Sequence, residues 1–245
     1  MSNLYSLRSS AADIADHFGV SGPPALDLPA EIKSGEPGIV VRQGAGGRVM
    51  QSLRWGFPRP QTDRVGDLLH LKPVNLLADL TNPMWDKMVP DPRYRCLIPL
   101  TAFAQPEGPR GRMTRTWFSV RDWPVFAWAG FCRRTEEWGP VYAAMTTDSG
   151  PPVAELNPRM PVILASQEYE RWLEGSIEDV IAFQFRPPFP SERFLVDRTN
   201  ELWVPRNRRR SAETKSSLGA HHSSGAFLSQ ANAPPQAKTL FPTDS

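Results

Sequence analysis

The chain has 245 residues, with 28 lysines and arginines against 26 aspartates and glutamates, so its formal net charge is only +2. This balance excludes a strong overall cationic field, and a nucleic-acid partner would need a local basic patch. Cys96 and Cys132 are the only cysteines. Both lie in apolar stretches, which excludes a disulfide framework and favours buried, reduced thiols. No apolar run approaches about 18 residues, so we expect no membrane span and a cytoplasmic protein.

The strand pattern begins at the N-terminus. The 26 prolines and 17 glycines favour short strands and turns over long helices. Leu4 to Leu7 predict a short buried strand, and residues 21–37 predict a loop. Residues 39–41 and 49–55 predict strands joined by a glycine-rich hairpin. Residues 58–72 predict a polar loop that carries Arg59, Arg64 and Lys72. Further strands are predicted at 94–100, 117–120, 125–131, 141–146 and 193–204.

Helix signals are fewer. Ser10 and Gly19 are typical of the two ends of a helix. A short helix and turn is predicted over 83–93, and further helices begin at Ser166 and at Ser176, where a capping box stands. These elements predict one α+β domain over residues 1–205, with a mostly antiparallel, barrel-like β core and short flanking helices. Residues 206–245 are basic, then rich in Ser, Ala, Gly, Gln and Pro, and predict a disordered tail.

The stretch 155–164 is the centre of the pattern. The polar turn Asn157-Pro158-Arg159 runs directly into the apolar segment Met160 to Leu164. A turn that feeds a buried strand holds its polar side chains at a rigid edge, which suits a reactive site. The same pattern also occurs where nothing reacts, so both interpretations stay open.

Several common sites are excluded. The sequence has no phosphate-binding glycine loop and no Ser-His-Asp signature. His221 and His222 are adjacent, but no further histidine or cysteine is spaced to complete a zinc site. We therefore predict neither a metal nor a cofactor.

Seven ordered pieces of the chain resemble the SRAP family. This is the SOS response-associated peptidase family, which includes proteins that crosslink to abasic sites in single-stranded DNA. The pieces span residues 1 to about 205: Met1-Ser2-Asn3-Leu4-Tyr5-Ser6-Leu7, Arg54-Trp55-Gly56, Val74-Asn75, Arg95-Cys96-Leu97-Ile98-Pro99, Phe103-Ala104-Gln105, Phe126-Ala127-Trp128-Ala129-Gly130 and Asn157-Pro158-Arg159-Met160-Pro161-Val162-Ile163-Leu164.

The resemblance implies four site positions. The family's nucleophile is a cysteine directly after the initiator Met, where this chain has Ser2; because serine is small, we expect Met1 to be removed. The family asparagine is kept as Asn75. Gln105 stands where the family has a glutamate, and Asn157 where it has a histidine. An arginine that follows the family asparagine by two positions is Leu77 here.

These replacements predict a divergent member with little or no catalysis. A thiolate is a strong nucleophile near neutral pH and a hydroxyl is not. Gln105 and Asn157 cannot take or give a proton, and general acid–base catalysis typically supplies about 10²–10⁴-fold. We therefore expect crosslinking and peptidase activity to be lost or strongly reduced, in a pseudoenzyme that keeps a polar pocket. The alternative is drift in a redundant copy, whose polar remnants only satisfy buried hydrogen bonds.

The resemblance implies that the partner is single-stranded DNA, with or without an abasic site. We expect the protein to be a monomer. Arg54, Lys72 and Arg159 would line a groove that contacts the backbone, and Trp55 or Trp85 would stack on bases. Solvent exposure alone also explains each arginine, and Trp55 also fits a residue of the core. Two other functions stay open. In the first, Ser2 is an N-terminal nucleophile that uses its own α-amine as the base, and the protein is an active peptidase or abasic-site lyase. In the second, the protein is a binding module for another protein and does not bind DNA.

Overall fold

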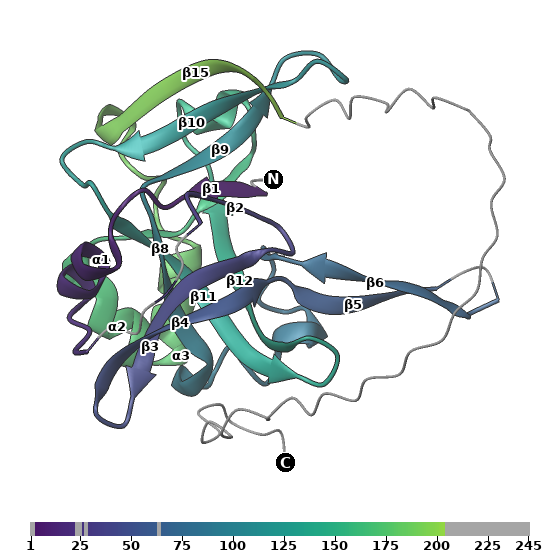
Figure 1. The fold of residues 1–245 in the computed structure, drawn as a ribbon, viewed down its shortest axis with the longest axis vertical. Helices are drawn as coiled ribbons and strands as arrows, with labels where there is room; N and C mark the ends of the chain where they lie inside the picture. Colours follow the sequence, from purple (N-terminus) through teal and green to yellow (C-terminus); the bar gives the residue numbers. More distant parts are fainter. Residues whose placement is uncertain (1–2, 23–25, 27–28, 63–64, 204–245) are drawn as a thin grey trace, which may run out of the picture.

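The computed structural model describes residues 3–22, 26, 29–62 and 65–203. Short, mostly antiparallel strands dominate, and short helices lie against them (Figure 1), so the predicted α+β class is confirmed. The proposed tail 206–245 lies outside the described residues. Among those that are described, no helix has the length and apolar character needed to cross a membrane.

The core of the fold is a closed ring of strands. β3 (Pro37–Gly44), β4 (Gly47–Trp55), β8 (Arg95–Leu100), β11 (Phe126–Thr135) and β12 (Gly139–Asp148) form it. Pairing runs from β12 through β4, β3, β8 and β11 and returns to β12. Every pairing is antiparallel except β12 with β4. The ring confirms the barrel-like core, and its interior is filled by large side chains such as Trp55 and Trp128, both fully buried.

Short strands extend the ring on one side. β13 (Arg159–Pro161) and β7 (Leu76–Leu77) both pair with β12, and β14 (Ile163–Leu164) pairs with β11. The apolar segment that follows Asn157 is therefore built into the sheet, as its composition predicts.

A second sheet lies at the upper end of the molecule in Figure 1. Its order is β15 (Phe194–Leu202), β10 (Thr114–Val120), β9 (Ala102–Glu107), β1 (Leu4–Ser6) and β2 (Glu31–Lys33). The predicted N-terminal strand is confirmed, since all of β1 is buried. β2 falls in a stretch predicted as loop; it is one short edge strand with a single buried residue, Ile32, too little for a period-two signal.

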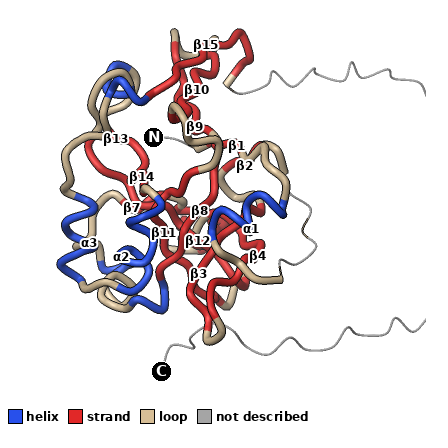
Figure 2. Tube along the Cα trace, turned by 90° about the vertical axis from the view of Figure 1, so that its left-hand side faces the viewer, coloured by secondary structure: helices blue, strands red, loops and turns tan. Residues whose placement is uncertain are grey.

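α1 (Ala11–Phe18) and α3 (Ile177–Gln184) begin at the caps that the sequence predicts, Ser10 and Ser176, whereas α2 (Tyr169–Glu174) begins at Tyr169 and not at Ser166. α1 starts in a capping box and ends at Gly19, whose φ of 65° suits glycine. α2 and α3 lie together on one side of the ring (Figure 2). The residues from Ser166 to Glu168 form a 3-10 turn, η4, before α2. The other 3-10 turns are η1 (Pro83–Trp85), η2 (Pro92–Tyr94), η3 (Val153–Glu155) and η5 (Ser191–Arg193).

The prediction of a polar loop over 58–72 is wrong. β5 (Phe57–Thr62) and β6 (Leu68–Val74) form a two-stranded ribbon that projects from the body (Figure 1). The polar and basic residues of this stretch suggested a loop, but they equally suit an exposed ribbon. Its prolines, Pro58, Pro60 and Pro73, are tolerated because a ribbon has unpaired outer edges, where a missing N–H costs little. Lys72 lies opposite Arg59 on this ribbon, while Arg64 lies outside the described residues.

Both cysteines, Cys96 and Cys132, are free and buried, as the sequence predicts. Cys96 lies in β8, and its carbonyl accepts a hydrogen bond from Trp172 Nε1 at 2.8 Å. Burial raises the pKa of the Cys96 thiol well above its ordinary value. The raised pKa of Cys96 is the opposite of what a reactive cysteine needs, and neither thiol has the exposure of one.

Candidate functional site

Gln105 and Asn157 meet inside the protein. Gln105 lies in β9, between β1 and β10, and Asn157 lies in the turn between η3 and β13. Asn157 Nδ2 donates a hydrogen bond to Gln105 Oε1 at 3.0 Å across 52 residues of sequence. Gln105 is fully buried and Asn157 nearly so. The structure thus brings together two of the side chains that the sequence proposes for one pocket.

The orientation of this amide pair is fixed from one end. Asn157 Oδ1 accepts a hydrogen bond from the backbone N–H of Arg159 at 3.0 Å. The oxygen of Asn157 is therefore directed at Arg159 and its nitrogen at Gln105. Because Asn157 presents a nitrogen, Gln105 must present its oxygen in return.

Arg159 is itself held in place by the body of the protein. Its guanidinium lies 2.7 Å from Asp148 Oδ1 and donates to the carbonyl of Thr146 at 2.5 Å and to that of Ala78 at 3.2 Å. The turn that carries Asn157 is therefore fixed to β12 and to the residue that follows β7. Its cation is also offset by a carboxylate, which weakens the prediction that Arg159 contacts DNA phosphates.

Asn75 is held by the barrel and faces the N-terminal strand. Its carbonyl accepts from Trp55 Nε1 at 3.0 Å and from the N–H of Ala144 at 2.9 Å. Its side-chain Nδ2 donates to Asn3 Oδ1 at 3.0 Å. Asn3 is a site residue that the sequence analysis missed. Its signal was a polar side chain directly before a buried strand, next to the proposed nucleophile.

The register of β1 relates the two amide pairs. Tyr5 lies opposite Phe103, so the same antiparallel register, continued by two residues, sets Asn3 opposite Gln105. Side chains alternate along a strand, so Asn3 and Tyr5 share the face toward the barrel. Ser2 lies outside the described residues, and its place in the pocket stays a prediction.

The described side chains of this pocket are amides. Amides donate and accept hydrogen bonds but do not titrate near neutral pH. On β1 and β12, the hydroxyls of Tyr5 and Tyr142 lie 2.6 Å apart. Burial raises the pKa of both phenols. The amide side chains of the pocket can therefore hold polar groups but cannot themselves move protons.

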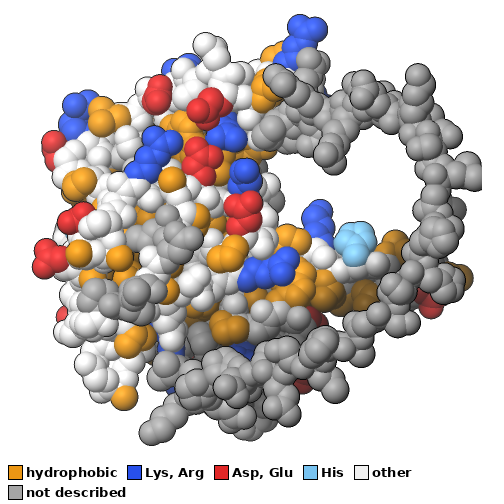
Figure 3. Space-filling model, in the orientation of Figure 1, with side chains coloured by type: hydrophobic (Ala, Val, Ile, Leu, Met, Phe, Trp, Pro, Cys, Tyr) orange, Lys and Arg blue, Asp and Glu red, His pale blue; other side chains and the backbone are white. Residues whose placement is uncertain are grey.

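The residues proposed to contact DNA differ in their exposure to solvent. Trp55 is fully buried and Trp85 is 2% exposed, so the prediction that either stacks on bases is wrong: their rings complete the core, against Tyr5 and Phe57 respectively. Arg54 is exposed, with its guanidinium carbon 4.1 Å from the centre of the Trp138 ring. Lys72 is exposed on the ribbon. Basic and acidic side chains are interspersed on the face shown in Figure 3, in keeping with the small net charge.

A closed β ring with a second sheet and a buried amide pocket beside the N-terminal strand defines a single-domain α+β protein. The chain belongs to the SRAP family: the family model described as SOS response associated peptidase (SRAP) matches residues 1–197. No curated protein sequence matches the chain.

Solved structures share the fold. A protein from Bordetella bronchiseptica is 21% identical, with a TM-score of 0.66, over 80% of this chain and 99% of its own. A protein from Bacteroides thetaiotaomicron is 19% identical, with a TM-score of 0.62, over 80% of this chain and 90% of its own. A phage-related protein from Bordetella bronchiseptica is 14% identical, with a TM-score of 0.62, over 80% of this chain and 93% of its own.

Proposed function

We propose that this SRAP protein recognises single-stranded or abasic-site DNA and that its covalent crosslinking and peptidase activities are lost or strongly reduced. Membership of an SOS-response-associated family supports a role in DNA damage. The observation that carries the proposal is the hydrogen bond between Asn157 Nδ2 and Gln105 Oε1. Two neutral amides contact each other at the positions that the resemblance assigns to a histidine and a glutamate.

The hydrogen-bonded amides of Gln105 and Asn157 favour a pocket whose polar character is retained over a pocket that has decayed by drift. Glutamine and asparagine preserve hydrogen-bonding capacity while they remove titration. Arg159 fixes the orientation of Asn157, and Asn157 fixes that of Gln105. One nitrogen of this pair, Gln105 Nε2, is buried without an acceptor in the described protein.

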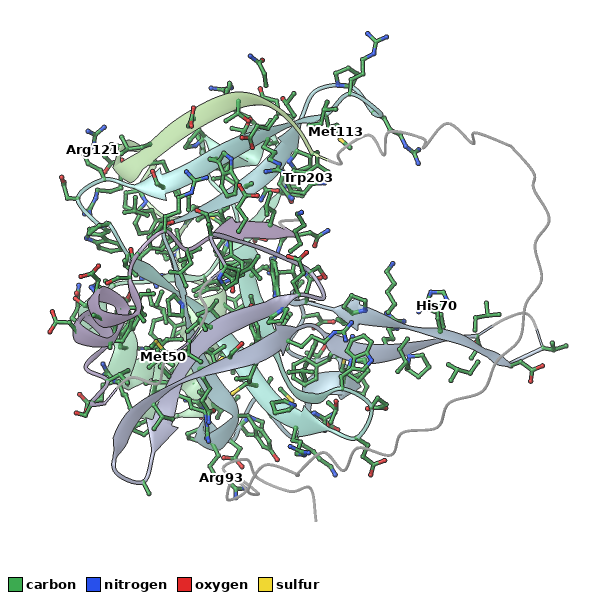
Figure 4. All side chains as sticks on the ribbon, in the orientation of Figure 1. Met50, His70, Arg93, Met113, Arg121 and Trp203 are labelled. Carbon is green, nitrogen blue, oxygen red and sulfur yellow. The ribbon has the colours of Figure 1, made fainter. Side chains whose placement is uncertain are left out.

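Exposed basic side chains on two elements support DNA as the partner. Arg59 and Lys72 stand opposite each other on the projecting ribbon, and both are exposed. His70 is on the same ribbon (Figure 4). Arg110 and Arg112 are exposed in the loop between β9 and β10. Phosphate contacts from such residues would give affinity without base specificity.

Fluorescence anisotropy with labelled single-stranded DNA, with and without an abasic site, at two salt concentrations, tests the binding. We expect affinity to fall as salt rises, since phosphate contacts release counterions. A binding constant insensitive to salt, or no binding, would contradict the proposal.

A denaturing gel tests the loss of chemistry. After incubation with abasic single-stranded DNA, we expect no heat-stable protein–DNA adduct. A stable adduct through Ser2, or acylation of Ser2 by an active-site probe, would favour the active-nucleophile alternative. Borohydride trapping separates a transient Schiff base at the α-amine from no reaction at all.

One observation favours the protein-binding alternative. At the tip of the ribbon, Val65, Leu68 and Leu69 are 84%, 63% and 62% exposed. Clustered exposed apolar side chains are typical of interaction sites. A partner that co-purifies after nuclease treatment, and is lost when Leu68 and Leu69 are both changed to serine, would favour this function over DNA binding.

A further inference from the structure

A groove of about 470 Å³ lies on the second sheet, on the face turned away from the barrel. Phe118 belongs to the main core, so its neighbours on β10, Trp117 and Ser119, have their side chains on the opposite face of that strand. Both line the groove, and residues of β1, β9 and β15 complete it. The groove is therefore separate from the amide pocket, since Gln105 shares its side of β9 with Phe103, which is also in the core.

The charges of this groove favour a cationic occupant. Its lining includes two carboxylates on β15, Asp197 and Glu201, and one basic side chain, Arg8. Arg8 already lies 3.6 Å from Glu31. Asp197 has no ion-pair partner among the described residues, and Glu201, although 3.0 Å from Arg115, keeps 60% of its side chain exposed. The carboxylates would repel a phosphate and attract a guanidinium or ammonium group.

The C-terminal segment of the same chain carries the matching charge. Residues 204–245 hold six of the 28 lysines and arginines and two of the 26 acidic residues, so their formal charge is +4 and that of residues 1–203 is −2. Four of these six cations stand close together: Arg206, Arg208, Arg209 and Arg210. The positive charge of the chain is thus concentrated directly after the strand that carries the two carboxylates.

This segment begins within reach of the groove. The described residues end at Trp203, one residue after β15, and Arg206 follows Glu201 by only five residues. Pro205 and Asn207 are residue types that favour turns. β15 is the end strand of its sheet, and no described strand lies beyond it. A turn after β15 would therefore bring the arginines back over the groove.

We propose that the basic run from Arg206 to Arg210 folds back over β15 and binds in this groove, where its guanidinium groups pair with Asp197 and Glu201. Ion pairs at such an exposed surface are individually weak. Here both partners belong to one chain and are joined by a short connection, so the effective concentration is high and weak contacts suffice. The inference concerns the protein alone and does not depend on the proposed binding of DNA.

Trypsin, which cleaves after lysine and arginine, tests the inference in the full-length protein. At low salt we expect cleavage within the basic run to be about fivefold slower in wild type than in the double variant Asp197→Asn, Glu201→Gln, the effect of two exposed ion pairs. Cleavage after Lys238, further along the same segment, should proceed at the same rate in both proteins. Mass spectrometry of the released peptides separates the two rates.

A matched variant and a change of salt guard against indirect effects. The double variant Glu136→Gln, Glu137→Gln removes two exposed carboxylates from the turn between β11 and β12, which does not line the groove, and should be cleaved as wild type is. Salt at about 0.5 M should remove the protection in wild type, since it screens charges at an exposed surface.

Three results would overturn the inference. Equal cleavage of the basic run in wild type and in the variant of Asp197 and Glu201 would show that these carboxylates do not hold it. An equal change after Lys238 would show that the variant alters the whole segment or the fold. Protection that grows with protein concentration would show that the segment of a second copy fills the groove. None of these results bears on DNA recognition, which the anisotropy measurement tests separately.

Discussion

The hydroxyl oxygens of Tyr5 and Tyr142 lie 2.6 Å apart, fully buried, and join the N-terminal strand to the barrel. Tyr5→Phe should leave the Tyr142 hydroxyl buried without its partner, at a cost of about 1–3 kcal/mol in the free energy of unfolding. Replacing both by phenylalanine should cost less than the two single changes added together, because no hydroxyl is then left unpaired. Urea unfolding of the four proteins gives this comparison; strict additivity would show that the hydroxyls do not interact.

Gly38 makes room for that pair. A Cβ at this position would collide with the hydroxyl oxygens of both Tyr142 and Tyr5, whereas at Gly46 it would meet open space. We expect Gly38→Ala to destabilise the protein by about 1–3 kcal/mol through overpacking. Gly46→Ala, in the turn between β3 and β4, is the control and should be close to neutral. Equal melting temperatures for the two variants would contradict this account.

His17 gives stability a defined pH dependence. Its Nε2 lies 3.0 Å from the Tyr169 hydroxyl, and burial lowers its pKa, although Asp16 opposes this. The unfolded chain then binds the proton more readily than the folded one. The contribution of His17 is therefore complete above its unfolded pKa of about 6.5 and is lost as pH falls through the lower folded value.

Free energies of unfolding measured at about pH 8 and about pH 5 test whether the stability that His17 contributes is lost at the lower pH. His17→Gln keeps a hydrogen-bonding group but cannot titrate, so the loss between the two pH values should be smaller than in wild type. His70→Gln, on the exposed ribbon, should leave the loss unchanged. If the fall in unfolding free energy were larger in His17→Gln than in wild type, the predicted direction of the pH dependence would be wrong.

Restoring the family's residues should restore chemistry. We expect the triple variant Ser2→Cys, Gln105→Glu, Asn157→His to form a heat-stable adduct with abasic single-stranded DNA. Ser2→Cys alone should be about 10²–10⁴-fold slower, since it lacks groups that move protons. Adduct formation over time on a denaturing gel measures both rates. Equal rates would show that Gln105 and Asn157 do not limit the reaction.

Charge on the ribbon should set the salt dependence of DNA binding. Lys72→Ala and Arg59→Ala should each weaken binding of all single strands and lower the slope of log affinity against log salt by about 0.7. Arg121→Ala is the control, because Arg121 lies on the far side of the upper sheet from the ribbon (Figure 4). An unchanged slope in both variants would show that Lys72 and Arg59 do not contact DNA phosphates.

The sequence predicted elements wherever one local signal decided the structure. Ser10, Gly19 and Ser176 placed helix boundaries, because caps act within a few residues. The β5–β6 ribbon was missed because polar and basic residues occur both in solvated loops and in exposed ribbons. Which structure forms depends on whether the two segments pair with each other, and that is a tertiary fact.

The site was predictable only in part. The resemblance named Gln105 and Asn157, and the structure brings them into contact. Trp55 fitted both a stacking platform for DNA and a core residue, and the structure shows it buried, with its Nε1 bonded to the Asn75 carbonyl. A tryptophan beside a basic residue gives the same sequence pattern whether its ring faces the core or the solvent. The partnership of Asn3 with Asn75 depends on the register of β1, which no local pattern reveals.

The ribbon's prolines have a further consequence for how copies of this protein meet. A projecting pair of strands with an apolar tip would ordinarily invite another chain to add a strand along its side and begin aggregation. Pro58 and Pro60 in β5 and Pro73 in β6 interrupt the row of N–H groups that such an incoming strand would need. Replacing them with β-formers such as valine would lengthen a docking edge and turn the ribbon into a seed for assembly.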